Sequence, residues 1–430
     1  MRQPSEPLAA QARALAKQGD WGGARTKLLE LVTEVIGTQA IDLKINRDQY
    51  SLNSLNGVAT LVDGRRFFFK YHNEEGEDKT IEEYYNAELL RAAGYRVDVP
   101  VYACGEPGRQ ILFYGLREDL RLADVCRNIE EAAGWQHMER VVRAQACYDK
   151  EALDIALRTL KVGNPAAVVK EPVHQLFHHR LATPELPDGL GGRVYRNYVG
   201  QRFTFPGAEV SWDVLKALKW VINGLEYNRT LEELFLEAGD VLAPAKLAGH
   251  GVVTAHGDAH NANVWFEDTQ GEARLVSFDP AFAGRHIPAL LAEIKATFHN
   301  IFAHPLWLYE PARVAERYKV YTRIEGGRIH VDFDWDLSPL REAFLASKAR
   351  EYWKPLIAEL KARNLLPLNW QRVMRLALFC CPTLVLDLRA GGNGGHTPDS
   401  SALGLAIAIS AGSEPVAGAD QFSRLFSAIA

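Results

Sequence analysis

Apolar and polar positions divide the chain into a strand-rich stretch near its start and a longer stretch with helical spacing. Residues 8–37 carry leucines and valines at intervals of three and four, which predicts one or two helices. Residues 41–72 then change to strand composition around a two-residue hairpin turn. Two more strands are predicted at Val97–Tyr102 and Gln110–Leu116.

Helical spacing prevails after Leu120, with loops rich in glycine, proline and asparagine between the apolar stretches. Residues 319–335 interrupt it with a predicted hairpin. In its second strand Asp332, Asp334 and Asp336 alternate with apolar residues, so we expect their carboxylates to share one face. Helices are predicted over residues 127–146, 150–161, 212–236, 287–302 and 338–389.

One lysine and one glutamate stand in apolar surroundings on neighbouring predicted elements. In the strand of residues 67–72, apolar side chains surround Lys70 on both faces, so its ammonium group needs a partner. A capping box predicts that the next helix begins with Thr80 as its N-cap. Glu88 falls within the apolar face of that helix. The sequence therefore predicts a Lys70–Glu88 ion pair, and the alternative is two separately solvated charges.

Oxygen-bearing side chains gather in residues 252–284, where short apolar runs predict strands. Asp258, Asn263 and Asp279 fall at or beside the ends of these strands, so we expect them to lie close together. Three oxygen ligands suit a hard cation such as Mg2+, and one carboxylate can remain as a base. His256 is expected to hold the loop by hydrogen bonding.

The motif His-Gly-Asp-x-His-x-x-Asn at residues 256–263, with Asp279-Pro280 after it, resembles the aminoglycoside phosphotransferases and fructosamine-kinase-like small-molecule kinases. In that family of protein-kinase-like fold, the resemblance implies that Asp258 accepts the proton of a substrate hydroxyl. It also implies that Asn263 binds Mg2+ and that Asp279 links Mg2+ to the phosphates of ATP.

The resemblance also implies a nucleotide-binding role for residues before residue 90. Lys70 would contact the phosphates, with Glu88 as its partner on the helix. The glycine-rich loop typical of kinases is replaced by a Ser/Asn loop with one glycine. Its side chains and backbone N–H groups can bind phosphate oxygens. The expected phosphate contacts in this loop are Asn53, Ser54 and Asn56.

The implied fold is α+β, a two-lobed protein-kinase-like architecture. Residues 1–39 would be an N-terminal helical extension, and residues 40–116 a nucleotide-binding N-lobe with an antiparallel sheet. Residues 117–430 would form a mainly helical C-lobe that contains the catalytic loop. The long separation between Lys70 and Asp258 predicts a substrate-binding helical insertion at about residues 127–205.

The implied function is ATP-dependent and Mg2+-dependent phosphorylation of a hydroxyl on a small molecule, such as a sugar, an amino-sugar, an amino-alcohol or an antibiotic. The aspartates at 332, 334 and 336 allow two interpretations. They could recognise a cationic substrate, or they could form a solvated strand face. Two other functions stay open: a nucleotide-binding pseudokinase scaffold, and a kinase-fold enzyme that transfers AMP or acts on a protein. His256, Asp258 and His260 could instead be ligands in a metal-dependent hydrolase, or part of a simple polar turn.

Composition bears on the partners and the location that we expect for the protein. The 430 residues are 47% hydrophobic and 24% charged with a net charge of −5, which is ordinary for a globular protein and allows two or more domains. No basic cluster predicts nucleic-acid binding, and no apolar run reaches transmembrane length. The first residues lack the apolar core of a signal peptide, and the five cysteines lack C-x-x-C spacing. We therefore expect a cytoplasmic protein that binds neither nucleic acid nor membranes.

Overall fold

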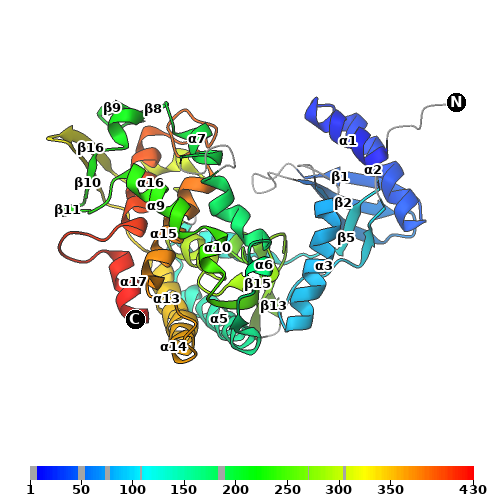
Figure 1. Ribbon diagram of the computed structural model, residues 1–430. Helices are drawn as coiled ribbons and strands as arrows, with labels where there is room; N and C mark the ends of the chain where they lie inside the picture. The colour runs from blue at the N-terminus through cyan, green and yellow to red at the C-terminus, as the bar shows by residue number, and fades with distance from the viewer. Residues whose placement is uncertain are drawn as a thin grey trace. The chain divides into compact units, whose positions relative to one another are not determined.

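The chain forms two compact units in the computed structural model (Figure 1). Unit 1 consists of residues 1–119 and 276–281, and unit 2 consists of residues 120–275 and 282–430. The combination of helix and sheet predicted from the sequence is confirmed. The structure describes residues 7–46, 54–72, 78–106, 109–182, 189–269, 271–303 and 307–430.

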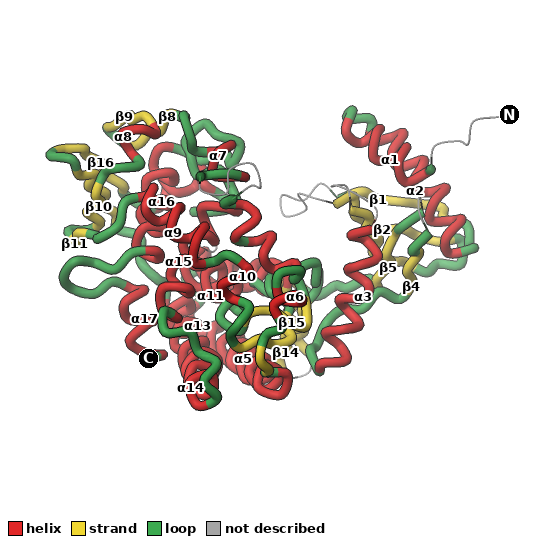
Figure 2. The backbone as a smooth tube through the Cα atoms, viewed as in Figure 1, coloured by secondary structure: helices red, strands yellow, loops and turns green. Residues whose placement is uncertain are grey.

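Unit 1 is built on a five-stranded antiparallel sheet in the order β1-β2-β3-β5-β4, which Figure 2 shows in yellow. The predicted alternation in β3 is confirmed, because Phe67, Phe69 and Tyr71 lie in one buried core together with the apolar residues of α1 and α2. The predicted N-terminal helices therefore cover one face of this sheet. Its strands are β1 Ala40–Ile45, β2 Ser54–Leu61, β3 Arg66–His72, β4 Tyr102–Cys104 and β5 Ile111–Gly115, and the helices of unit 1 are α1 Leu8–Lys17, α2 Trp21–Ile36 and α3 Asp78–Ala93.

Two boundaries in unit 1 differ from the prediction. The helix α3 begins at Asp78, so Thr80 lies within it and is not its N-cap. The strand predicted at Val97–Tyr102 is mostly irregular, and only an isolated parallel bridge joins Val97 to Ser277. This bridge attaches residues 276–281, which include Asp279, to unit 1.

Unit 2 is mainly helical (Figure 2), and its helix α16 is buried along nearly its whole length. Small and apolar residues all round this helix allow such burial. In the described part of the chain, no helix is long and apolar enough to cross a membrane. The helices of unit 2 are α4 Leu122–Glu131, α5 Met138–Thr159, α6 Pro165–Val168, α7 Gly192–Asn197, α8 Trp212–Leu215, α9 Leu231–Val241, α10 Pro244–Leu247, α11 Ile294–Thr297, α12 Val314–Arg317, α13 Pro339–Ser347, α14 Lys354–Ala362, α15 Trp370–Val385, α16 Pro398–Gly412 and α17 Gln421–Ile429.

Short strands in unit 2 flank the His-Gly-Asp motif of residues 256–258 and form the predicted hairpin. β12 pairs antiparallel with β15 and β7, and it leads into the His-Gly-Asp motif. The hairpin predicted at residues 319–335 is confirmed as β16 and β17. These strands are β6 Leu120–Arg121, β7 Lys161–Val162, β8 Arg202–Phe205, β9 Ala208–Ser211, β10 Lys219–Ile222, β11 Leu225–Glu226, β12 Gly251–Ala255, β13 Val264–Thr269, β14 Glu272–Ser277, β15 Gly284–Pro288, β16 Val320–Glu325 and β17 Arg328–Phe333.

Two helices predicted in unit 2 are wrong over much of their length. Residues 212–236 contain a hairpin, β10–β11, because Asn223 and Gly224 both take positive φ values (47° and 80°) and form a tight turn. Residues 287–302 begin in β15, and helix starts only at Ile294. In the predicted insertion at 127–205, α5 is a long helix, whereas residues 160–182 and 189–205 form only short elements.

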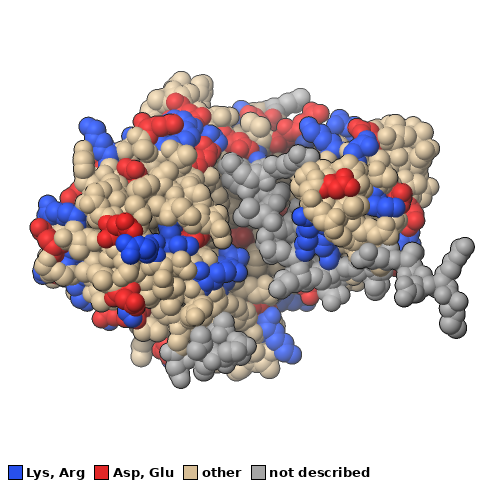
Figure 3. Space-filling view, turned by 90° about the horizontal axis from the view of Figure 1, so that it is seen from above, with Lys and Arg blue, Asp and Glu red and all other residues tan. Residues whose placement is uncertain are grey.

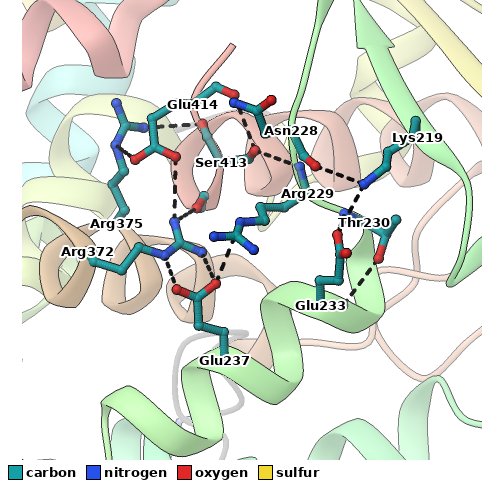
Figure 4. A network of polar contacts seen from close by, with 11 residues as sticks. Lys219, Asn228, Arg229, Thr230, Glu233, Glu237, Arg372, Arg375, Ser413 and Glu414 are labelled. Atoms are coloured by element: carbon teal, nitrogen blue, oxygen red, sulfur yellow. Dashed lines mark hydrogen bonds and ion pairs between the residues drawn. The ribbon is translucent and has the colours of Figure 1, made fainter. Parts of the chain in front are cut away.

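Polar contacts join distant segments of unit 2 (Figure 4). Arg372 of α15 contacts both carboxylate oxygens of Glu237 in α9, at 2.5 and 2.7 Å, and also donates to the carbonyl of Gly412. Arg375, one turn later, lies 3.1 Å from Glu414. On the surface, by contrast, charges of both signs are intermixed (Figure 3).

Candidate active site

Lys70 and Asp279 form an ion pair within unit 1 although 209 residues separate them in the chain. Lys70 Nζ lies 2.6 Å from Asp279 Oδ1. The lysine side chain is 9% exposed and the aspartate side chain 36% exposed, so only the carboxylate reaches solvent to a substantial extent. Lys70 and Asp279, to which the family resemblance gives separate roles toward ATP, therefore contact each other directly.

The backbone around Asp279 is fixed by contacts to unit 1. Ser277 accepts a backbone hydrogen bond from Asp98 and donates one to Arg96, at 2.8 and 2.9 Å. Asn86 of α3 donates its amide to the carbonyl of Pro280 at 3.1 Å. Asp279 itself adopts a left-handed conformation with φ of 56°, which aspartate tolerates better than most residues. The carboxylate is thus presented by a constrained turn.

Glu88 does not meet Lys70 in this structure. Its carboxylate is bonded to Arg91 at 2.6 Å, one turn later on α3, and its side chain is 33% exposed. Among the α3 side chains that the structure describes, Ala87 and Leu90 are buried, and Glu88 lies beside this buried face. The helix does contact the Asp279 segment, but through Asn86, which the sequence analysis did not single out and for which no local pattern gives a signal.

The predicted phosphate loop is described only in part. Asn53 lies outside the described residues, and for Ser54 the structure describes the backbone alone. Asn56 is buried in β2 and stands directly opposite Lys70 in the register of β2 and β3. Directly opposed residues place their side chains on one face of a sheet. Asn56 is therefore a neighbour of Lys70, as its predicted role requires.

A glycine determines the backbone conformation of the loop of residues 256–263 in unit 2. Gly257 has a φ of 78°, and a Cβ atom there would lie 2.8 Å from the carbonyl oxygen of Phe282. A side chain would therefore be strained by conformation and by contact. His256 is fully buried, and its Nδ1 accepts the backbone N–H of Asp258 at 3.3 Å. The predicted role of His256 in holding the loop is confirmed.

Asn263 is oriented toward the same loop. Its amide nitrogen donates to the carbonyl oxygen of Asp258 at 3.0 Å. Because this bond uses the nitrogen, the amide oxygen of Asn263 is the atom suited to a cation. In the described residues, no group of three or more His, Cys, Asp or Glu side chains could hold a metal. Mg2+ takes amide oxygens among its ligands in proteins, together with carboxylates, phosphate oxygens and water.

The aspartates at 332, 334 and 336 do not share one strand face. β17 ends at Phe333, so Asp334 and Asp336 are not on a strand face with Asp332, and that prediction is wrong for them. Asp334 accepts the backbone N–H of Lys319 at 2.8 Å, and Asp336 accepts that of Leu337 at 2.8 Å.

Three histidines of unit 2 lie in two consecutive 3-10 turns, His174 in η2 Pro172–Leu176 and His178 with His179 in η3 His178–Arg180. His174 is buried, and its Nε2 lies 2.9 Å from the carbonyl of Val168. Burial lowers the pKa of His174 to about 4.

Comparison with known proteins gives remote structural likenesses. No protein-family model matches the chain, and no curated protein matches its sequence. Among solved structures, it is similar to a candidate fructosamine-3-kinase from Thermobifida fusca YX-ER1, with 12% identity and a TM-score of 0.38 over 90% of this chain and 98% of the other. It is also similar to a microcompartment-associated aminopropanol kinase, with 13% identity and a TM-score of 0.38 over 89% and 94% of the two chains. For APH(2'')-IIia, solved with GDP and kanamycin, the identity is 10% and the TM-score 0.40 over 82% and 87%.

Proposed function

We propose that the chain is an ATP-dependent kinase that phosphorylates a hydroxyl group of a small molecule. Unit 1 would be the nucleotide-binding lobe and unit 2 the catalytic lobe of a protein-kinase-like fold. The observation that carries the proposal is the Lys70–Asp279 contact at 2.6 Å, because it joins two residues with separately assigned roles toward Mg2+–ATP. The ordered His256–Asp258 loop supports it from unit 2.

Each side chain then has a distinct task. When bound, Mg2+ neutralises charge on the phosphates of ATP, and ATP supplies the phosphoryl group. Lys70 binds phosphate oxygens with its ammonium group, and Asn56 adds a polar contact on the same face of the sheet. Asp279 and Asn263 offer a carboxylate oxygen and an amide oxygen to Mg2+.

Asp258 acts on the acceptor. Its carboxylate orients the substrate hydroxyl and takes its proton while the new oxygen–phosphorus bond forms and the bond to the ADP oxygen breaks. The acceptor class we propose is a small hydroxyl compound. Asp334 and Asp336 accept hydrogen bonds from backbone N–H groups of unit 2, so they do not support a preference for cationic acceptors.

A binding measurement tests the proposal without knowledge of the acceptor. We expect Mg2+ and a non-hydrolysable ATP analogue to bind by isothermal titration calorimetry, and Lys70→Met to weaken that binding about tenfold or more, since charge-assisted contacts to phosphate are strong. Arg274→Met is the matched control, because Arg274 pairs with Glu272 on the surface of unit 2. Absence of nucleotide binding by the parent protein would overturn the proposal.

A further inference from the structure

A buried segment of unit 2 packs directly on the loop that carries Asp258. It comprises α11 and the π-helical turn Phe298–Ala303 that continues it. Asn300 accepts the backbone N–H of Asn261 at 2.7 Å, and the rings of His260 and His299 lie 5.1 Å apart. This buried segment therefore packs against the inner side of the loop and helps to hold its conformation.

Lys295 is a buried cation in that segment. It is 4% exposed, and its Nζ lies 2.7 Å from Nε2 of His299. An ammonium group can only donate, so Nε2 accepts and the proton of a neutral His299 is on Nδ1. Nδ1 lies 3.3 Å from the hydroxyl of Tyr309 and can donate to it. Lys295, His299 and Tyr309 thus form a directed chain of hydrogen bonds.

Another buried lysine of unit 2 shows what is unusual about Lys295. Lys348 lies 2.6 Å from Asp149 and 3.0 Å from Glu293, so its charge is balanced by two carboxylates in contact. For Lys295, no carboxylate within the described ranges lies at ion-pair distance. A buried ammonium group with no carboxylate in contact is costly, so Lys295 must be stabilised by charges at a greater distance.

The charge that most favours the ammonium form of Lys295 comes from Asp258. Burial lowers the pKa of Lys295, and the Asp258 carboxylate is the largest influence that raises it. Cys381 also raises the pKa of Lys295, whereas Arg180 and Arg193 lower it. The interaction is reciprocal, so the ammonium group of Lys295 also stabilises the carboxylate of Asp258.

We propose that Lys295, held by His299, is a positioning residue that acts through Asp258 in the phosphoryl transfer. The proposal rests on the proposed function, because it concerns the base of that reaction. Lys295 does not touch the reacting atoms. Its role is to hold the charge and orientation of the Asp258 carboxylate from within the protein.

The test is a double-mutant cycle of Lys295→Met and Asp258→Asn, with kcat measured for phosphoryl transfer. The acceptor is taken from a panel of sugars, amino-alcohols and antibiotics. Lys295→Met keeps the length of the side chain and removes its charge. We expect kcat to fall about 10–100-fold, as for other residues that orient a functional group. KM for ATP and for the acceptor should stay within about threefold, because binding is not affected. In the Asp258→Asn background, Lys295→Met should have no further effect on kcat.

Stability measurements separate this role from a structural one. Lys295 makes no ion-pair contact in the described ranges, so its replacement by an apolar side chain of similar length should leave Tm unchanged or raise it. Lys348→Met is the matched comparison and should lower Tm, since it leaves two buried carboxylates without their cation. Lys295→Arg, which retains the charge, should keep more activity than Lys295→Met.

The outcomes distinguish the two proposals. If Asp258→Asn transfers phosphate at the parent rate, the proposed function fails. If Asp258→Asn is slow but Lys295→Met has the parent kcat, only the role of Lys295 is overturned. The same conclusion holds if the two effects on kcat multiply in the double variant, or if Lys295→Met loses activity only in proportion to lost folded protein.

Discussion

At the scale of single residues, the site depends on side chains that are fixed by neighbours on other elements. Lys70 is held in β3 and Asp279 in a turn attached to α3 by Asn86. The lysine and the aspartate could each be selected from the sequence, because one stands in an apolar strand and the other at a strand end. Their mutual contact could not, since no local pattern encodes a pairing across 209 residues.

The Lys70–Asp279 contact predicts an energetic coupling. In nucleotide-free protein, the cycle of Lys70→Met and Asp279→Asn should show a coupling of about 1 kcal/mol in the free energy of unfolding, as for other contacting pairs. The cycle of Lys70→Met and Glu88→Gln should be additive, because Glu88 is bonded to Arg91. Urea unfolding measures both cycles. Strong coupling to Glu88 and none to Asp279 would contradict the observed pairing.

At the scale of elements, strands with clear alternation could be predicted, and segments governed by turns could not. β3 and the β16–β17 hairpin have the predicted faces or positions. The helix predicted at 212–236 is wrong because Asn223-Gly224 reverses the chain, a turn signal that outweighs apolar spacing. α3 was predicted as a helix, but Glu88 was placed within its apolar face, whereas Ala87 and Leu90 are buried among the side chains that the structure describes.

The conformation of Gly257 gives a test at this scale. Gly257→Ala should lower the free energy of unfolding by about 1–2 kcal/mol and also slow transfer, because it strains the turn before Asp258. Gly249→Ala is the control, since no atom lies within 4 Å of an added Cβ and its φ is ordinary. Equal effects of the two substitutions on stability and rate would contradict a special role for the Gly257 turn.

The contacts of Arg372 in Figure 4 predict where unit 2 derives stability away from the site. Arg372→Met should lower the free energy of unfolding by about 2–3 kcal/mol, because it removes both short hydrogen bonds to the partly buried Glu237 and leaves that carboxylate with the longer Arg229 contact at 3.8 Å. Arg274→Met removes an exposed ion pair and should change the free energy of unfolding by less than about 0.5 kcal/mol. Chemical denaturation would show whether the two ion pairs differ in this way.

At the scale of the whole molecule, the chain divides into units that do not follow the order of the sequence. Residues 276–281 belong to unit 1 although most residues around them belong to unit 2. The backbone bridge between Val97 and Ser277 attaches them. The sequence could indicate that Asp279 ends a strand, but the unit it joins depends on this long-range bridge.

Buried histidines of unit 2 predict how the molecule responds to acid. Burial lowers the pKa of both His174 and His396 to about 4, so the unfolded chain binds these protons at higher pH than the folded one. Stability is therefore fully present above about pH 6.5 and is lost as the pH falls toward 4, by about 3 kcal/mol for each histidine. His174→Gln should flatten this dependence, whereas substitution of the exposed His137 should not. Unfolding curves at several pH values would show whether the slope changes.

The central claim is that Asp258 is the base of a phosphoryl transfer from ATP to a small hydroxyl compound. The most direct measurement is single-turnover transfer by the parent protein and by Asp258→Asn, together with titration of each by Mg2+–ATP. The acceptor comes from a panel of sugars, amino-alcohols and antibiotics, with the phosphorylated product identified by mass spectrometry.

For Asp258→Asn we expect nucleotide affinity within about twofold of the parent and transfer slowed about 10²–10⁴-fold, because the substitution keeps the size of the side chain and removes the base. Parallel loss of binding and transfer would instead make Asp258 a structural or metal-binding residue. An Asp258→Asn protein that transfers phosphate at the parent rate would contradict the account.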